Sequence, residues 1–145
     1  MGMSLHGGEW RIHASAVDET RVIEDSLSWL CEGLSEIVVK KENSTLGAPM
    51  QTISVKMKGR DALSSLAKVE RDSLVYLLEG GLDSRVDEDK FFHVRLRLDK
   101  LVQGVGVISR NSNDPVAKGK FKLEVYPGQK STEVAEDLII GLIGE

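Results

Sequence analysis

The sequence predicts an α+β fold, a two-layer sandwich in which helices pack on one face of a mainly antiparallel sheet and the other face stays open and basic. Residues 90–100 give the clearest signal, because apolar and polar side chains alternate along them. A strand there puts Phe92, Val94, Leu96 and Leu98 on one face and His93, Arg95, Arg97 and Asp99 on the other. A strand covered on both faces would be apolar throughout, so this split indicates a sheet that packs helices on one side and meets water on the other.

The first half of the chain reads as strand, helix, strand, strand. We expect the strands at residues 9–17, 36–42 and 51–58, with a turn-forming stretch at residues 43–49. The helix follows the first strand, since apolar residues at helical spacing begin after Asp18, a predicted N-cap, and Gly33 is well placed to end it.

The second half adds two helical regions and two strands around a long polar loop. We expect a helical region at residues 60–82, broken near residues 70–73, and then the strand at 90–100. A helical turn and a short strand should follow within residues 101–108, and then a loop at residues 109–119. The chain should end with a strand at residues 120–126 and a helix from about Thr132. Loops as long as residues 109–119 are more often functional than loops of ordinary length.

The chain is long enough, at 145 residues, to bury a core without metals or disulfides. We expect residues 1–8 to be a disordered or tag-like N-terminus and residues 9–145 to form a single domain. The only cysteine, Cys31, falls in a predicted helix and is interpreted as a small buried hydrophobe. Without an apolar run of membrane-spanning length or the pattern of a signal peptide, we expect a cytoplasmic protein with no membrane association.

The net charge of −4 argues against a generally basic nucleic-acid coat, but a local basic patch depends only on where the charges lie. The outward positions of the predicted strands are mostly basic: Arg11, His13, Lys56, Lys58, His93, Arg95, Arg97, Lys120 and Lys122, with Lys40 added if the second strand has the expected register. Most acidic residues fall on helices and turns. This distribution resembles the electrostatic footprint of a nucleic-acid binder on an otherwise acidic protein.

Phosphate is the ligand that such a face would hold. Arg95 and Arg97 are the strongest single candidates, because guanidinium groups grip phosphate oxygens in a bidentate geometry. The predicted RNA-binding residues are Arg95, Arg97, Lys56, Lys58, Lys122, Lys120, Arg11 and His93, with Arg110 and Asn111 in the long loop. Only Tyr126 and Phe91 are aromatic candidates for the outward face, so recognition of backbone and shape is favoured over reading of bases.

Two simpler interpretations of the same residues stay open. Lysine and arginine on the wet face of a sheet are ordinary solvating residues, and the face could instead be a homodimer interface, although many like charges in a symmetric contact would repel. The sequence gives little support for a catalytic function. The three histidines lack metal-ligand spacing, and Gly104-Val105-Gly106 lacks the ending of a phosphate loop. We therefore predict no enzyme activity, cofactor or metal site.

Four segments in order resemble an archaeal family. Residues 85–89 (RVDED) and 94–100 (VRLRLDK) are similar to its Arg-Val-Asp-x-Asp turn and Leu-Arg-Leu-Asp-Lys strand end. Residues 46–50 (LGAPM) look like its Gly-x-Pro segment, and residues 122–127 (KLEVYP) look like its closing strand. The family is an uncharacterised one of predicted RNA-binding or exosome-associated proteins. The resemblance implies a fold like that of ribosomal protein L-five and a role in RNA binding. The chain departs from the pattern at Leu101, where the family commonly has Gln.

The leading hypothesis is a non-enzymatic RNA-binding protein that grips the phosphate backbone of structured RNA through the basic sheet face, in an RNA-processing setting. The alternative is a protein-interaction subunit that docks onto a larger RNA-processing or ribosomal assembly without touching RNA. A third hypothesis is a metal-dependent nuclease that uses acids between Asp87 and Asp99.

Overall fold

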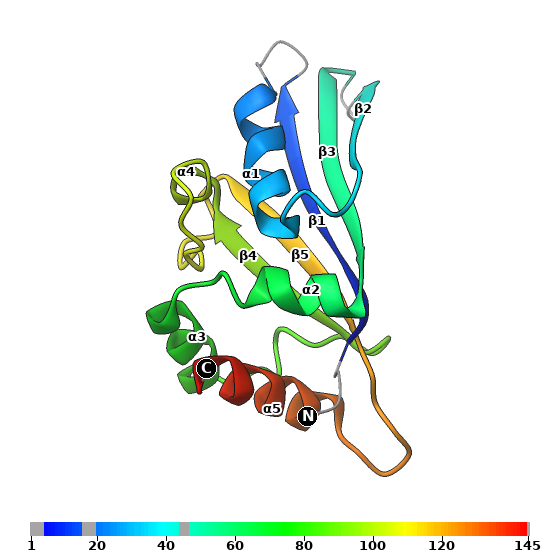
Figure 1. The fold of residues 1–145 in the computed structure, drawn as a ribbon, viewed down its shortest axis with the longest axis vertical. Helices are drawn as coiled ribbons and strands as arrows, with labels where there is room; N and C mark the ends of the chain where they lie inside the picture. Colours follow the sequence, from blue (N-terminus) through cyan, green and yellow to red (C-terminus); the bar gives the residue numbers. More distant parts are fainter. Residues whose placement is uncertain (1–4, 16–19, 44–46, 145) are drawn as a thin grey trace.

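The structure is a computed structural model that describes residues 5–15, 20–43 and 47–144. It is an α+β fold built on one antiparallel sheet of five strands in the order β2-β3-β1-β5-β4 (Figure 1). The strands are β1 (Leu5–Ser15), β2 (Ile37–Asn43), β3 (Pro49–Lys58), β4 (Phe91–Arg97) and β5 (Val116–Leu123). The helices are α1 (Arg21–Cys31), α2 (Gly59–Leu66), α3 (Arg71–Glu79), α4 (Leu98–Leu101) and α5 (Ser131–Ile143).

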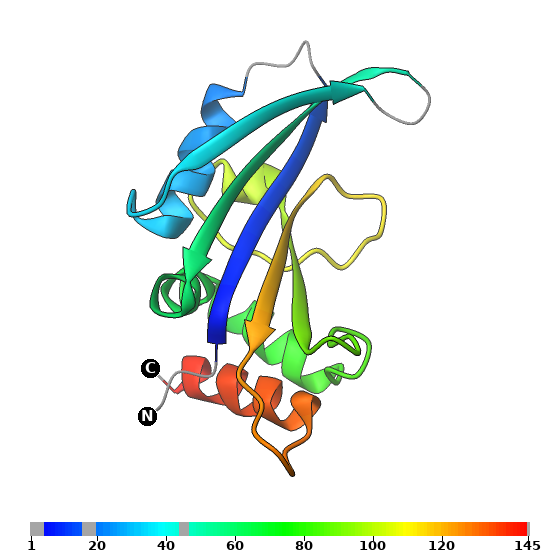
Figure 2. The ribbon, with the colours of Figure 1, turned by 90° about the vertical axis from the view of Figure 1, so that its right-hand side faces the viewer.

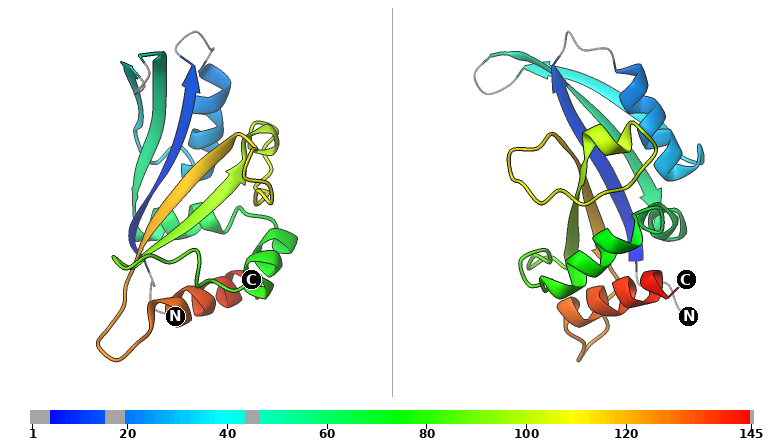
Figure 3. Two further views of the ribbon diagram at one scale, coloured as in Figure 1. Left: turned by 180° about the vertical axis from the view of Figure 1, so that it is seen from behind. Right: turned by 90° about the vertical axis from the view of Figure 1, so that its left-hand side faces the viewer.

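The long strand β1 is the central strand of a curved sheet, flanked by β3 and β5, and the helices gather on one side of the sheet (Figures 1 and 2). Helices α1 and α2 lie against β1 and β3, while α3 and α5 pack on each other at the end of the sheet. The view from behind shows the strands in front of α1 and α2 (Figure 3). The predicted arrangement of helices on one face is therefore confirmed.

The core forms where the apolar faces of the strands meet the helices. Trp10 of β1 and Phe121 of β5 pack edge to face, with ring centroids 5.2 Å apart. The indole Nε1–H of Trp10 donates to Ser65 Oγ of α2 at 2.9 Å, which satisfies a buried donor between sheet and helix. Gly119 leaves room for both rings, since a Cβ there would lie 2.7 Å from each of them. Cys31 is buried and unpaired, as expected.

The start of the domain differs from the prediction. Residues 5–8 belong to β1, where Leu5 is fully buried, so the disordered or tag-like segment does not extend to residue 8. The sequence hides this because Gly7 and Gly8 read as linker, yet a Cβ at Gly8 would clash with the Phe121 ring. Residues 1–4 and the predicted N-cap Asp18 lie outside the described residues.

Other element boundaries also differ from the prediction. Leu98 and Asp99 belong to α4 and not to the preceding strand, because the chain turns into a helix after Arg97. The last strand begins at Val116 and ends at Leu123, so the polar loop is shorter than residues 109–119. The break in the second helical region falls at residues 67–70, just before the expected position. No helix among the described residues is long and apolar enough to cross a membrane.

Candidate nucleic-acid interface

The strand register places the predicted outward residues of four strands side by side on the open face. A row is here the set of residues that are directly paired across neighbouring strands. The two Cα atoms of each such pair lie about 4.5–5.5 Å apart. Going from β3 through β1 and β5 to β4, one row contains Lys58, Gly7, Lys122 and Phe91. The next contains Lys56, Glu9, Lys120 and His93. The third, here called the central row, contains Ser54, Arg11, Lys118 and Arg95.

Lys118 is a member of this face that sequence reasoning missed. It falls within the stretch predicted as loop, since Asp114-Pro115 and Gly119 are turn-forming residues. In the structure Lys118 is exposed at the centre of β5, between Arg11 of β1 and Arg95 of β4. Alternation with the buried residues Ala117 and Gly119 could have revealed it.

The charges are not spread evenly over the open face. A concave pocket of about 590 Å³ over β1, β2 and β3 is lined by Glu9, Glu36 and Glu42 as well as by Arg11, Lys40 and Lys56, so these charges balance. The other half is positive. It is called here the basic surface and consists of Lys118, Lys120 and Lys122 of β5 with His93 and Arg95 of β4. A polyanion would therefore be attracted to the β4–β5 half of the sheet.

Within the balanced half, Arg11 is already paired. Its Nη2 lies 3.0 Å from Glu9 Oε1 on the same strand face. A second polar chain crosses to the sheet edge, where His13 Nδ1 lies 3.2 Å from Thr52 Oγ1 and this hydroxyl donates to Glu42 at 3.1 Å. Burial lowers the pKa of His13 below its ordinary value, and the nearby cations Lys118 and Arg11 lower it further.

Phe91 is an aromatic residue that adjoins the basic surface, and lysine ammonium groups cover its ring. The Nζ atoms of Lys120 and Lys122 lie 4.3 and 4.7 Å from the ring centroid. Such cation–π contacts hold the two ammonium groups at one end of the surface. Tyr126 lies beyond the end of β5, and its hydroxyl donates to Glu124, which raises the pKa of Tyr126. The face therefore offers no pair of free rings for base stacking among the described residues.

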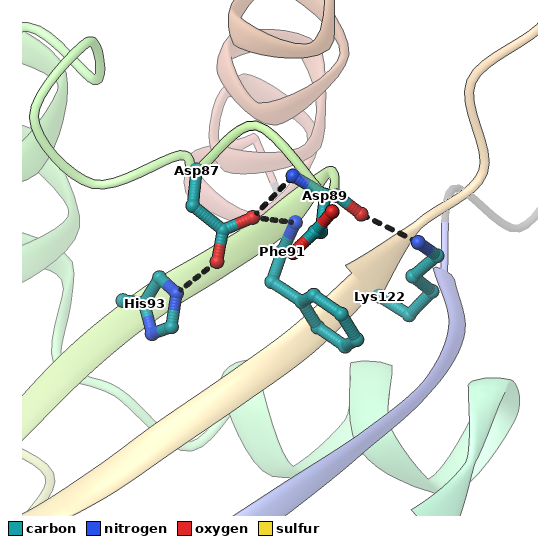
Figure 4. Close-up of polar contacts among 5 residues, drawn as sticks. All are labelled: Asp87, Asp89, Phe91, His93 and Lys122. Atoms are coloured by element: carbon teal, nitrogen blue, oxygen red, sulfur yellow. Dashed lines mark hydrogen bonds and ion pairs between the residues drawn. The ribbon is translucent and has the colours of Figure 1, made fainter.

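A tight turn supports this end of the basic surface (Figure 4). Asp87 Oδ1 accepts the backbone N–H groups of Asp89 and Phe91, and Oδ2 lies 2.7 Å from His93 Nε2. The hydrogen bond from His93 and those from the backbone hold the pKa of Asp87 below its usual value. Lys122 donates to the carbonyl of Asp89. The turn thus fixes His93 and Lys122 from the side.

The two arginines singled out by the sequence differ in availability. Arg97 makes a bidentate pair with Asp99, with Nη2 to Oδ2 at 2.6 Å and Nε to Oδ1 at 3.1 Å. This contact lowers the pKa of Asp99 and raises that of Arg97. Arg95 is exposed and makes no ion pair within the described part of the chain. Arg95 is therefore the better placed of the two to receive a ligand.

The loop residues Arg110 and Asn111 lie beyond the β4 edge of the sheet. Together with Arg95 they line a pocket of about 290 Å³. The Arg110 guanidinium lies over the ring of Tyr76, 4.1 Å from its centroid. Asn111 Oδ1 accepts the N–H of Asn113 at 3.0 Å, which holds the loop in shape. Of the predicted residues, these two join the basic surface only through Arg95.

Two of the acidic residues near the basic surface are engaged in structural contacts. Asp87 holds the turn and Asp99 holds Arg97. Among residues 5–15, 20–43 and 47–144, no group of three His, Cys, Asp or Glu side chains is placed to hold a metal ion. The nuclease hypothesis stays a prediction.

The fold and this surface define an open-faced α+β sheet protein, and comparison with solved structures finds the same fold in archaeal proteins. The structure is similar to Mth689, a DUF54 protein from Methanothermobacter thermautotrophicus, with a TM-score of 0.71 and 19% identity over 97% of this chain and 98% of that one. It is similar to AF2318, a DUF54 protein from Archaeglobus fulgidus, with a TM-score of 0.75 and 22% identity over 92% of this chain and 99% of that one. A UPF0201 protein from Methanococcus jannaschii aligns with a TM-score of 0.60 and 7% identity over 92% of both chains.

These likenesses show a shared fold across nearly the whole chain. No protein-family model matches the sequence, and no curated protein matches it. The expected similarity to archaeal proteins is confirmed for the architecture. The RNA-binding and exosome-associated roles implied by the sequence resemblance stay predictions.

Proposed function

We propose that the protein is a non-enzymatic RNA-binding protein that holds the phosphate backbone of structured RNA against the basic surface. The observation that carries the proposal is the central row, in which the neighbours Arg11, Lys118 and Arg95 are all cationic. Lys118 and Arg95 make no ion pair among the described residues, so both are free to neutralise phosphate.

Backbone recognition fits this surface better than base reading. The ring of Phe91 is covered by two lysine ammonium groups, and bases would have to displace them to stack. Lysines 118, 120 and 122 repeat every second residue along β5, so their charges follow a line. A line of positive charge suits the repeating charge of a nucleic-acid strand. The resemblance to predicted exosome-associated proteins points to RNA processing as the setting.

Salt dependence tests the proposal. An RNA hairpin labelled for fluorescence anisotropy would be titrated with protein over a series of NaCl concentrations. Engagement of four phosphates in a single-stranded part of the RNA gives a slope of log K against log salt of about −3, from about −0.7 for each contact. Binding that does not change with salt would contradict the proposal.

A matched pair of variants locates the contact. Lys118→Ala with Arg95→Ala removes two free cations of the basic surface, so the slope should become shallower by about 1.4. Lys41→Ala with Arg60→Ala removes the same charge from the helix side of the molecule and should leave the slope unchanged. Hairpins of different sequence should all weaken alike in the first variant, whereas loss for one sequence alone would indicate base reading.

A second function is favoured by the opposite edge of the sheet. Strand β2 is an edge strand and is exposed along nearly its whole length, including Val38 at 48% and Val39 at 37%. Open edges can pair with a strand of another protein. The protein would then be an interaction subunit of an RNA-processing or ribosomal assembly, and a pull-down that survives nuclease treatment would favour this function over direct RNA binding.

A further inference from the structure

We propose that the pocket beyond β4 binds a phosphomonoester, the terminal phosphate of an RNA strand that lies on the basic surface. This inference rests on the proposed function and adds the end of the strand as a recognised feature. The pocket, called here the arginine pocket, has a volume of about 290 Å³ and is lined by Arg85, Arg95 and Arg110, with Tyr76, Ser109 and Asn111 among its other residues. Arg85 and Tyr76 were not among the residues predicted from the sequence.

Backbone hydrogen bonds at the outer edge of β4, the edge that does not face β5, bring the three arginines together. The N–H of His93 donates to the carbonyl of Arg85 at 2.7 Å, which ties residue 85 to one part of the edge. Further along this edge, the N–H of Ser109 donates to the carbonyl of Arg95 at 2.8 Å. This hydrogen bond holds the loop that contains Arg110 beside Arg95. The segments around residues 85, 95 and 110 thus supply one guanidinium each. Their meeting point is fixed by the main chain and does not depend on the arginine side chains.

The arginine pocket is positively charged without internal compensation. No aspartate or glutamate lines it. Within the described part of the chain, Arg85, Arg95 and Arg110 form no ion pair, and the Arg110 guanidinium lies over the Tyr76 ring, 4.1 Å from its centroid. A guanidinium stacked on a ring keeps its N–H groups at its edge free for hydrogen bonds. Three unpaired guanidinium groups around one space favour an anion with several acceptor atoms.

A terminal phosphate matches this demand better than an internal one. A phosphomonoester carries a charge of about −1.5 to −2 near pH 7 and three terminal oxygens. An internal phosphodiester carries one negative charge, and the RNA strand must continue out of the pocket on both sides of it. The arginine pocket lies beyond the last strand of the sheet and adjoins the basic surface through Arg95, which is paired with Lys118. A strand that follows the β5 lysines would reach the arginine pocket at its end.

The test compares RNA hairpins of one sequence with a 5′-phosphate, a 3′-phosphate or hydroxyl groups at both ends. We expect one of the phosphorylated forms to bind about tenfold more tightly than the hydroxyl form, because charge-assisted hydrogen bonds to the arginines are gained. In Arg85→Ala this preference should disappear, while the affinity and salt slope for the hydroxyl form stay unchanged, since Arg85 is outside the basic surface. Arg60→Ala, at an exposed position of α2, serves as the matched control and should keep the preference.

A small-molecule arm separates failure of this inference from failure of the proposed function. Adenosine 5′-monophosphate and adenosine would each be added while the arginine side-chain NMR signals are recorded. Equal binding of all three hairpins would overturn the inference and leave the proposed function standing. Shifts with the monophosphate alone, lost in Arg85→Ala, without binding of any hairpin would keep a phosphomonoester site but overturn RNA as its source. If the hairpins bind equally or not at all and the monophosphate moves no signal, the arginine pocket is no phosphate site.

Discussion

Lys118 and Arg95 face each other as a directly paired couple across β4 and β5. Arg11 lies on the other side of Lys118, so three cations occupy neighbouring positions of the central row. Like charges directly opposite each other destabilise a sheet. Glu9 relieves Arg11, but Lys118 and Arg95 make no ion pair within the described chain. The fold therefore holds a repulsion that a bound polyanion would remove.

Replacing Lys118 with threonine should stabilise the free protein while weakening its binding to RNA. The expected gain in the free energy of unfolding is about 0.2–1 kcal/mol, the size of one cross-strand pair. Urea unfolding at low and high NaCl measures it, and the gain should shrink in high salt because screening already weakens the repulsion in the wild type. Lys41→Thr is the control. Lys41 also lies on a strand, β2, but on the face of the sheet that the helices cover, so the variant should show no such salt dependence. A stability loss in Lys118→Thr would contradict the assigned repulsion.

Arg95→Ala should weaken RNA binding more than Arg97→Ala. The guanidinium of Arg97 is held by Asp99 through two hydrogen bonds, and phosphate would have to compete with that carboxylate. Arg95 has no such competitor. We expect the salt slope to become shallower by about 0.7 in Arg95→Ala and by less in Arg97→Ala. Equal slopes for the two variants in anisotropy titrations would show that the ion pair does not restrain Arg97.

Asp99→Asn should increase the affinity for RNA. The substitution removes a negative charge and the bidentate partner of Arg97, so one more guanidinium becomes available beside Arg95. The expected slope steepens by about 0.7 relative to the wild type. Asp137→Asn, an exposed acid on helix α5, removes the same charge as a control. Loss of RNA binding in Asp99→Asn would point to a direct role for this carboxylate instead.

The alternation of apolar and polar residues was sufficient to predict the sheet and its open face. In β4 each predicted inward residue from Phe92 to Leu96 is buried, and His93 and Arg95 lie on the open face. The period of two fixes the face of every strand residue without knowledge of its neighbours. Strand ends were less predictable, because the first residues of β5 lie between Asp114-Pro115 and Gly119, which are typical of turns.

The composition of the candidate site depended on contacts that a linear pattern does not contain. Charge balance over β1, β2 and β3 follows from register, which brings Glu9 opposite Lys56. The arginine pocket requires Arg85, Arg95 and Arg110 to meet at the edge of β4 through the backbone bonds of His93 and Ser109. In the sequence, residues 85–89 stand out only through their resemblance to the Arg-Val-Asp-x-Asp turn of the archaeal family. Pairing of Arg97 with Asp99 was missed because the helix α4 turns Asp99 back toward Arg97.

Removing the side chain of Asp87 should loosen the turn that supports His93 and Lys122. Asp87→Ala loses three hydrogen bonds at a largely solvated site, so we expect a loss of about 1 kcal/mol in the free energy of unfolding at neutral pH. The pKa of Asp87 is lowered in the folded state, so its contribution is present above about pH 4 and is lost as the pH falls through the folded-state pKa. The difference between wild type and variant should therefore shrink in acid. Glu88→Ala, in the same turn, is the control.

Gly119→Ala should destabilise the core although it adds only one methyl group. A Cβ at this position would lie 2.7 Å from both the Trp10 and Phe121 rings, and both rings are fully buried, so neither can move aside freely. Overpacking of this kind costs about 1–3 kcal/mol. Urea unfolding measures the loss, and Gly144→Ala at the end of α5, where the nearest atom is 3.6 Å away, should cost little. Unchanged stability in Gly119→Ala would mean that β5 can shift relative to β1, and the register that brings Lys118 beside Arg11 would then not be fixed by the core.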